Sequence, residues 1–213
     1  MASRPVFVPS KRKNEADVYM TEFQWNSGLA VSQKQKNITA LHEAFVQRFP
    51  ERKVLEISSK SLQPLGVKLS AFNLTKMVPS LGREVPVECV FQGGKVFSAG
   101  GPYVDLYGAS SKDAKKDSRL RSSGMLKEFY FEGERIPTSP TTAFYNWLYV
   151  NALLEHPQLA EEVLAYDAFT DIEFNPAKSL NCQAEAAALF VALARKGLLE
   201  QCKTFETFLT LIK

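Results

Sequence analysis

Residues 182–196 read CQAEAAALFVALARK, and this stretch indicates its secondary structure more clearly than any other. Alanine and leucine are strong helix formers. Asn181 stands where it could cap the amino end, Arg195 and Lys196 suit the negative end of the helix dipole, and Gly197 is a typical residue after a helix. We therefore predict a helix here, capped by Asn181.

The stretches on both sides of this helix are also helical in pattern. Residues 143–156, AFYNWLYVNALLEH, follow Pro140 and Thr141 and carry apolar side chains at helical spacing. Pro157 suits the first position of a further helix, and a last helix is expected from about Thr204 to Ile212. The C-terminal third is therefore predicted to be mostly helical.

The first two thirds mix helix and strand. Ile38, Leu41, Phe45 and Phe49 recur at spacings of three and four, which predicts a helix between Ser32 and Pro50. Two segments favour strands, and the glycine in the second indicates a hairpin; they are VLEIS (54–58) and FYFEGER (129–135).

The N-terminal segment is rich in prolines and basic residues, so we expect residues 1–20 to be an irregular arm. Residues 21–213 are expected to fold as one domain. Together these patterns predict an α+β protein that is predominantly helical, with a small sheet supplied by the first two thirds of the chain.

The amino-acid composition indicates a folded domain and not a membrane-spanning protein. The 213 residues are 45% hydrophobic and 23% charged, as in average soluble domains, and no run of apolar residues is long enough to span a membrane. The first residues lack the apolar core of a secretory signal. We expect a cytoplasmic protein without a membrane partner.

Cysteine and histidine are scarce. Cys89, Cys182 and Cys202 show no paired spacing, and His42 and His156 are the two histidines of the chain, so we expect neither disulfides nor a metal site. Phosphate-binding, dinucleotide-binding and serine-hydrolase motifs are missing from the sequence, and we expect no cofactor. Any catalysis should rest on carboxylates, lysines or hydroxyl groups.

Basic residues gather in two clusters. The first is Lys11–Lys13, and the second contains Lys112, Lys115, Lys116, Arg119 and Arg121. Each cluster is either a surface that contacts phosphates or a solvated loop. The sequence leaves both interpretations open.

Four polar segments contain glycine or proline, aromatic residues and a few ionisable groups, as do the loops that line ligand pockets. They are residues 58–74, 88–95, 100–108 and 165–183.

Several motifs in these segments resemble those of the NADAR superfamily, whose members act on N-glycosides related to NAD and ADP-ribose. Leu69–Asn73, LSAFN, is similar to the family's L-S-N-F-Y, and Glu88, Phe91, Gln92 and Lys95 match its E-x-x-F-Q-x-x-K. Asp171 or Asp167, followed by Asn181, resembles its late elements. The likeness is closest to the NADAR antitoxins that accompany DarT-type guanine ADP-ribosyltransferase toxins, and it runs from Phe23 to Gln183.

The sequence departs from the family pattern at three positions. Ala71 replaces an asparagine, and Gly93 and Gly94 replace alanine and glutamine. Local rules alone favour a hairpin with a Gly-Gly turn over residues 87–97. The resemblance implies a helix, which would bring residues 88, 91, 92 and 95 to one face, and we favour the helix.

The resemblance implies removal of ADP-ribose from guanine bases of DNA, single-stranded DNA included, with free ADP-ribose as product and a DarT-type toxin as partner. Two alternatives stay open. One is an N-glycosidase that acts on a free N-ribosyl metabolite, and the other is a non-catalytic antitoxin that binds the toxin.

The same resemblance suggests the site residues. Glu88 is expected to act as acid, base or cation stabiliser. Lys60 or Lys95 is expected to attack the ribose, with Lys60 slightly favoured because Glu88 should keep Lys95 protonated. Asp171 is a further catalytic candidate, although it could simply cap a turn. Residues expected to bind ADP-ribose or the base are Ser70, Phe72, Asn73, Gln92, Gly100, Gly101, Tyr103, Asp105 and Asn181, with the phosphates held by the turn at residues 100–103.

Overall fold

The computed structural model describes residues 1–177 and 179–212. The strands are β1 (Ala2–Pro9), β2 (Ala16–Phe23), β3 (Val54–Glu56), β4 (Thr75–Val78), β5 (Arg83–Pro86), β6 (Lys95–Phe97), β7 (Leu126–Phe131), β8 (Glu134–Pro137) and β9 (Ala168–Thr170). The helices are α1 (Val31–Arg48), α2 (Pro64–Lys68), α3 (Val87–Gly93), α4 (Ser111–Lys116), α5 (Arg119–Ser122), α6 (Ala143–Leu154), α7 (Pro157–Val163), α8 (Gln183–Arg195) and α9 (Phe205–Leu211), with 3-10 turns η1 (Pro79–Leu81), η2 (Val104–Gly108) and η3 (Leu199–Cys202). More residues are helical than extended, which confirms the predicted α+β class.

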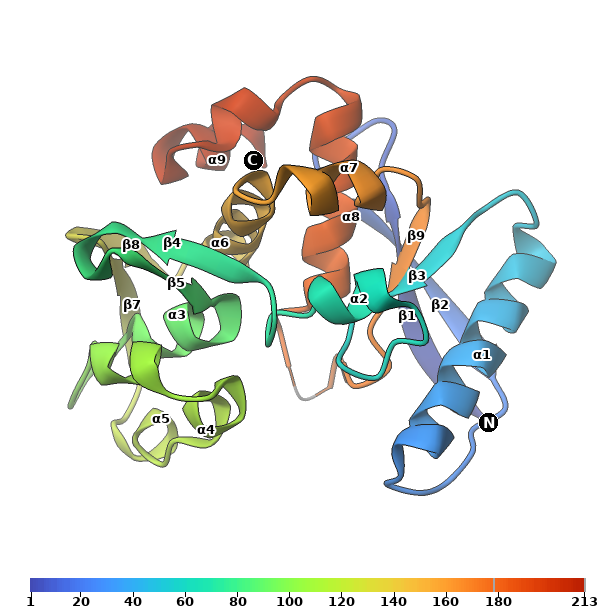
Figure 1. Cartoon of the computed structure of the whole chain (residues 1–213), viewed down its shortest axis with the longest axis horizontal. Helices are drawn as coiled ribbons and strands as arrows, with labels where there is room; N and C mark the ends of the chain where they lie inside the picture. Colours follow the sequence, from blue (N-terminus) through green and yellow to red (C-terminus); the bar gives the residue numbers. More distant parts are fainter. Residues whose placement is uncertain (178, 213) are drawn as a thin grey trace.

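A four-stranded sheet in the order β2–β1–β9–β3 lies between α1 and α8 (Figure 1). Successive side chains of a strand point to opposite faces. Val6 and Val8 accordingly pack in the cluster that contains the apolar residues of α1, whereas Phe7 and Phe169 pack in the cluster that contains those of α8. Both faces of the sheet are therefore covered.

The N-terminal segment is not an irregular arm. Its β1 and β2 form a hairpin that pairs from Ala2↔Phe23 to Pro9↔Ala16, so that prediction is wrong. Proline removes a hydrogen-bond donor from a ladder, but β1 pairs with β9 only at Phe7↔Phe169, away from Pro5 and Pro9. Pairing along the whole length of β1 with the neighbouring strand β2 thus overrides the local signal of the prolines.

The largest sheet is also not supplied by the first two thirds of the chain alone. Its strand β9 comes from the C-terminal third and pairs in parallel with β3. Parallel strands end at the same edge of a sheet. The residues that follow Glu56 and Thr170 therefore lie next to each other, and this edge is where the candidate site forms.

Most predicted helices are confirmed, with one error at a cap. The helix expected between Ser32 and Pro50 is α1, Pro157 opens α7, and Gly197 follows α8 with a φ of +69°. Asn181 does not cap α8: the residue in the cap position is Cys182, and no side chain caps this end.

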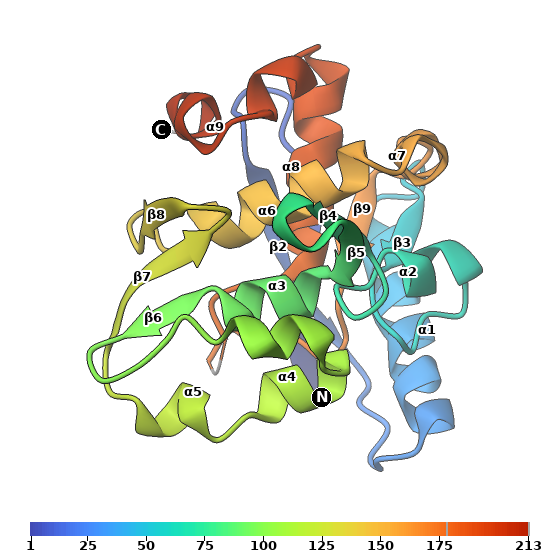
Figure 2. The ribbon, with the colours of Figure 1, turned by 60° about the vertical axis from the view of Figure 1, so that its left-hand side comes forward.

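The hairpin predicted at residues 129–135 is formed by β7 and β8, which with β6 make a second, three-stranded sheet. Aromatic rings of this sheet pack on α3 and α6: the centroid of Phe129 lies 4.7 Å from that of Phe144 and 5.5 Å from that of Phe91. Figure 2 shows α3 between this sheet and α4. Buried aromatic packing therefore fixes the position of α3.

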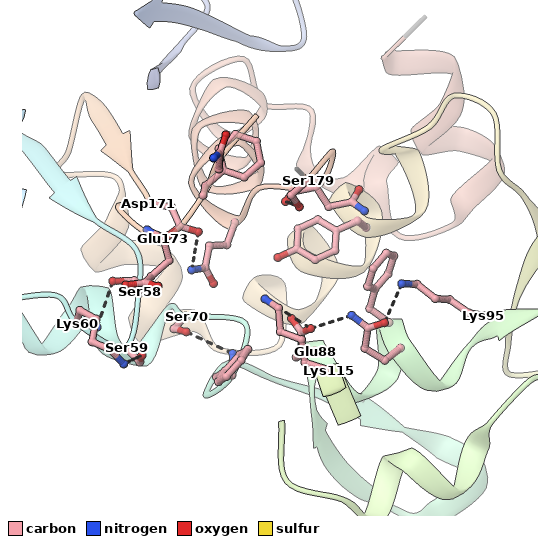
Figure 3. Close-up of a pocket in the computed structure, with 18 residues that line it drawn as sticks. Ser58, Ser59, Lys60, Ser70, Glu88, Lys95, Lys115, Asp171, Glu173 and Ser179 are labelled. Atoms are coloured by element: carbon pink, nitrogen blue, oxygen red, sulfur yellow. Dashed lines mark hydrogen bonds and ion pairs between the residues drawn. The ribbon is translucent and has the colours of Figure 1, made fainter. Parts of the chain in front are cut away.

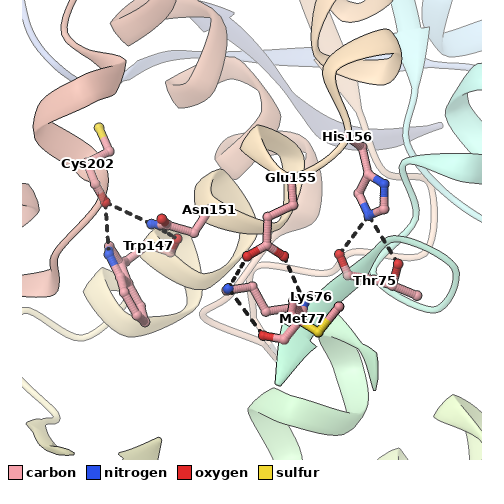
Figure 4. Close-up of polar contacts among 8 residues, drawn as sticks. All are labelled: Thr75, Lys76, Met77, Trp147, Asn151, Glu155, His156 and Cys202. Atoms are coloured by element: carbon pink, nitrogen blue, oxygen red, sulfur yellow. Dashed lines mark hydrogen bonds and ion pairs between the residues drawn. The ribbon is translucent and has the colours of Figure 1, made fainter. Parts of the chain in front are cut away.

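Helix α6 connects the small β4–β5 sheet with the C-terminal turns (Figure 4). Beyond its end, Glu155 forms an ion pair with Lys76 and accepts a 2.7 Å hydrogen bond from the backbone N–H of Met77. At its other side, the side chains of Trp147 and Asn151 both donate to the carbonyl of Cys202. These contacts hold β4 and η3 on opposite sides of α6.

Candidate active site

A cavity of about 580 Å³ lies between the edge formed by β3 and β9 and the helices α3 and α4 (Figure 3). This volume is typical of ligand pockets. Its walls come from five parts of the chain, which are residues 58–72, residues 88–95, Lys115, Tyr145 and residues 171–183. The lining residues are Ser58, Ser59, Lys60, Ser70, Phe72, Glu88, Phe91, Gln92, Lys95, Lys115, Tyr145, Asp171, Glu173, Phe174, Asn175, Ser179, Asn181 and Gln183.

Gln183, at the start of α8, holds three wall segments together. Its Nε2 donates to the carbonyl of Ile57 at 2.7 Å and to Asp171 Oδ2 at 3.0 Å. Its Oε1 accepts a 2.8 Å hydrogen bond from the N–H of Ala71, within the LSAFN motif. One side chain thus fixes the ends of both parallel strands relative to the motif.

The opposite wall carries a chain of three polar side chains. Gln92 Nε2 donates to Glu88 Oε1 at 2.8 Å, one helical turn away, and Lys95 Nζ donates to Gln92 Oε1 at 2.7 Å. The helix favoured by the family resemblance is therefore confirmed for residues 87–93, and the hairpin alternative is wrong. Lys95 itself begins β6, but its amine reaches back to the helix.

Burial controls the charge of Lys95. The pKa of its amine is lowered to about 8, first because burial disfavours the ammonium ion and then because Lys115 adds a like charge. Glu88 acts in the opposite direction, as the sequence suggested, but burial outweighs it. The amine also lies 4.7 Å from the ring centroid of Phe91. The lowered pKa increases the neutral fraction of the amine at mildly basic pH.

Lys115 brings a second cation to the cavity from α4. Its Nζ lies 3.9 Å from Glu88 Oε1 and 5.3 Å from the ring centroid of Phe72. Glu88 is 5% exposed, so its carboxylate sits at the bottom of this wall with one amide and one ammonium close by.

A pair of carboxyl groups lies at the ends of β3 and β9: Asp171 lines the cavity, and Glu56 is buried behind it. Glu56 is 2% exposed and accepts hydrogen bonds from Thr170 Oγ1 at 2.6 Å and from the N–H of Ile172 at 2.9 Å. Burial and the neighbouring Asp171 raise the pKa of Glu56 to about 8, and burial raises the pKa of Asp171 to about 6. Two carboxyl groups that interact in this way titrate as a pair. Asp171 Oδ1 also accepts from the N–H of Glu173, the turn-capping contact considered as its alternative role.

The model of the DarT1-associated NADAR antitoxin family matches residues 2–213. The chain belongs to this family. None of the curated proteins compared with the chain matches it. Family membership associates this NADAR protein with the DarT1 toxin system. Among the described residues, no helix has the length and apolar character to cross a membrane.

The NADAR fold brings eight of the predicted site residues to the cavity. They are Lys60, Ser70, Phe72, Glu88, Gln92, Lys95, Asp171 and Asn181. The Oδ1 atom of Asn181 is buried and has no hydrogen-bond partner among the described residues. Asp167, the alternative to Asp171, lies outside the cavity and pairs with Arg195.

Five predicted binding residues do not line the cavity. Asn73 donates to the carbonyl of Val67, and Gly100, Gly101, Tyr103 and Asp105 surround the far side of α3. The ring of Tyr103 stacks on the Arg119 guanidinium at 4.5 Å, and its hydroxyl contacts Ser123. The turn at residues 100–103 therefore supports α3, and a phosphate-binding role for it stays a prediction.

Three residues at or next to the cavity were not predicted as site residues from the sequence. Lys115 appeared only as part of a basic cluster, Tyr145 is one aromatic residue in a core helix, and Glu56 is one polar residue in a strand. Burial raises the pKa of Tyr145 well above its usual value, so its hydroxyl remains a hydrogen-bond donor. A charged residue within the apolar, strand-like stretch of residues 54–58 is the signal that could have revealed Glu56. Within residues 1–177 and 179–212, no three His, Cys, Asp or Glu side chains gather as a metal site would require.

Proposed function

We propose that this NADAR antitoxin is an ADP-ribosyl glycosidase that removes ADP-ribose from guanine bases of DNA and so reverses the modification made by its DarT1 toxin. The observation that carries the proposal is the partly neutral amine of Lys95, hydrogen bonded to Gln92 beside the buried carboxylate of Glu88. This arrangement is suited to attack on an electrophilic sugar carbon.

The proposed reaction cleaves the bond between C1″ of the ribose and a nitrogen of guanine. The neutral Lys95 amine supplies the electron pair that forms the new C1″–N bond. The electron pair of the glycosidic bond passes to the guanine nitrogen, which takes up a proton. Ring opening then gives an imine, and addition of water releases ADP-ribose and restores the amine. Glu88 lies where a carboxylate could stabilise positive charge on the ribose or transfer these protons.

Lys95 is a better nucleophile candidate than Lys60, which the sequence slightly favoured. Lys60 Nζ donates to Ser59 Oγ at an exposed position. Lys95 is instead held next to Glu88, and its lowered pKa supplies neutral amine without a separate base. Desolvation is one of the established ways to activate a lysine.

The test incubates the protein with an oligonucleotide that carries ADP-ribosylated guanine, with and without cyanoborohydride. We expect release of ADP-ribose, and in the presence of the reductant a covalent ADP-ribose adduct that peptide mapping places on Lys95. Lys95→Arg, which keeps the charge but forms no such imine, should form no adduct, and Lys60→Arg is the matched control that retains it.

Each of three other outcomes would contradict a different part of the proposal. Normal turnover without any adduct would make water the nucleophile. Protection against the toxin without release of ADP-ribose would favour a non-catalytic antitoxin, and turnover of free N-ribosyl metabolites alone would favour the small-molecule alternative.

A further inference from the structure

The second basic cluster of the sequence forms one surface beside the cavity. We call it the basic ridge: Lys112, Lys115, Lys116, Arg119 and Arg121, on α4 and α5. Residues 111–122 contain these five cations and two aspartates, a net charge of +3, which equals the net charge of the whole chain. The positive charge of the protein is thus concentrated in one short segment.

Helix geometry places the lysines of α4 on one side. Ser111 and Ala114 are buried against the body of the protein. At 3.6 residues per turn, Lys115, Lys112 and Lys116 follow in order within an arc of about 100° that starts next to this buried face. Lys115 reaches into the cavity at the start of the arc. The other two lysines continue the positive surface outward from the cavity.

Three cations of the ridge are unused by the fold. Arg119 pairs with Asp105 and Asp117, at 2.7 and 2.9 Å. Lys112, Lys116 and Arg121 are exposed, and in the described part of the chain no carboxylate lies within ion-pair distance of them. A solvated loop does not require unpaired cations that continue outward from a cavity, whereas a surface that contacts phosphates does.

We propose that the basic ridge binds the phosphate backbone of the DNA strand next to the modified guanine. The inference rests on the proposed function. A base that reacts in a pocket must leave the stack while its strand stays outside, and the strand then passes over the cavity wall. Helix α4 is that wall: Lys115 lines the cavity, and Lys112 and Lys116 continue outward from it along the helix. Arg121 extends the positive charge onto the neighbouring α5.

The first basic cluster, Lys11–Lys13, is a matched control at the other end of the molecule. Gln183 at the amino end of α8 lines the cavity, whereas Lys196 after its carboxyl end contacts the carbonyl of Lys13. Thirteen residues of helix separate these contacts by about 20 Å. Removing three charges there changes the net charge equally but leaves the cavity rim untouched.

The test compares Lys112→Gln/Lys116→Gln/Arg121→Gln with Lys11→Gln/Arg12→Gln/Lys13→Gln. Binding of an unmodified single-stranded oligonucleotide is measured by fluorescence anisotropy against salt concentration. Loss of three phosphate contacts should reduce the log–log salt slope by about 2 and weaken binding about 50-fold at 0.15 M salt. The control variant should keep the slope and affinity of the wild type.

A second measurement separates recognition of the strand from chemistry. The ridge variant should lose a similar factor in kcat/KM on the ADP-ribosylated oligonucleotide and almost nothing on ADP-ribosylated guanosine, which has no strand. Equal losses on both substrates, equal losses in the control variant, or unchanged oligonucleotide binding would overturn the inference. So would a ridge variant whose only defect is weaker binding to purified DarT1. If the wild type releases no ADP-ribose, the proposed function fails, while the binding comparison still decides on the ridge.

Discussion

At the scale of single residues, two opposing effects set the state of Lys95. Transfer of an ammonium ion out of water disfavours its charge, and the nearby Glu88 carboxylate favours it. Burial is the larger effect here, and the pKa of the amine falls to about 8. A motif shows which charges are neighbours in a helix, but not how much water reaches them. For that reason the motif identified both residues, but the expectation that the pKa of Lys95 would be raised was wrong.

The first prediction concerns Glu88. Glu88→Gln should lower turnover on ADP-ribosylated DNA by roughly 100-fold or more, because it removes a carboxylate from the reacting groups. The same change removes a cause that raises the pKa of Lys95. The acidic limb of the rate profile, where the rate rises as Lys95 loses its proton, should therefore move to lower pH. An unchanged rate in a correctly folded variant would remove Glu88 from the mechanism.

The second prediction concerns the buried carboxyl group of Glu56. Its folded-state pKa of about 8 lies above the usual value, so the folded protein retains a proton that the unfolded chain loses near pH 4. The stability that this proton provides is complete at low pH and is lost as the pH rises through 8. Between pH 6.5 and 8.5 the contribution of Glu56 to the free energy of unfolding should fall, at most by about 1.4 kcal/mol per pH unit. Lys95, whose pKa is lowered in the folded protein, contributes with the opposite sign near pH 8.

Glu56→Gln mimics the protonated form and should flatten this dependence. Thermal unfolding followed by circular dichroism between pH 6.5 and 8.5 measures it. This pH range avoids the titration of His42. Burial lowers the pKa of His42 to about 4, so its contribution to stability is lost only at lower pH. Equal slopes for the variant and the wild type would show that Glu56 is ionised in the folded protein.

At the scale of elements, α3 shows why local rules favoured a hairpin and were wrong. Glycine is a poor helix former and a common turn residue. Here the two glycines are needed because other chain segments approach closely. A Cβ on Gly93 would lie 2.5 Å from the Tyr107 ring and 2.9 Å from the carbonyl of Tyr103, and one on Gly94 would lie 2.7 Å from the carbonyl of Tyr130. Tertiary contact, invisible in a single sequence, explains both residues.

The third prediction tests this explanation. Gly93→Ala should destabilise the protein by about 1–3 kcal/mol, the usual cost of overpacking, although alanine is the better helix former. Gly108→Ala is the control, since its nearest neighbour would be Arg83 at 3.9 Å and its change should be close to neutral. Urea unfolding of the two variants compares them directly. A more stable Gly93→Ala protein would mean that the helix propensity, and not the contact with Tyr107, controls this position.

At the scale of the whole molecule, the elements that the sequence predicted correctly are those whose pattern repeats over a short stretch of chain. Helices such as α1 and α6 repeat their apolar spacing locally, and their patterns predicted them. The strand β9 depends on β3 and β1, which are far away in the sequence, and it was not expected. The hairpin of β1 and β2 is local and was also not expected, because prolines and basic residues are typical of irregular segments. The same holds for the site. One sequence motif predicted the wall formed by α3, whereas Lys115, Tyr145 and Glu56 are far from that motif in the sequence and are brought near it by the fold.

The last prediction follows from the way this cavity is built. Residues after β3, in α3, in α4 and around the start of α8 all contribute to its walls, so a ligand that fills it contacts segments that the chain must fold to bring together. A ligand that binds only the folded state stabilises it by about 2.7 kcal/mol at 100 times its dissociation constant. For a domain of this size, that corresponds to a rise in Tm of roughly 5–10 °C.

Free ADP-ribose, the proposed product, should therefore raise the Tm in a thermal-shift titration and inhibit release of ADP-ribose from DNA. The basic ridge variant is an informative control, because free ADP-ribose has no strand to place on Lys112, Lys116 and Arg121. Its Tm shift should match that of the wild type even where its binding to oligonucleotides is weakened. If millimolar ADP-ribose leaves the Tm of the wild type unchanged, the cavity does not hold this ligand, and the assignment of Lys95 and Glu88 as its reacting groups fails with it.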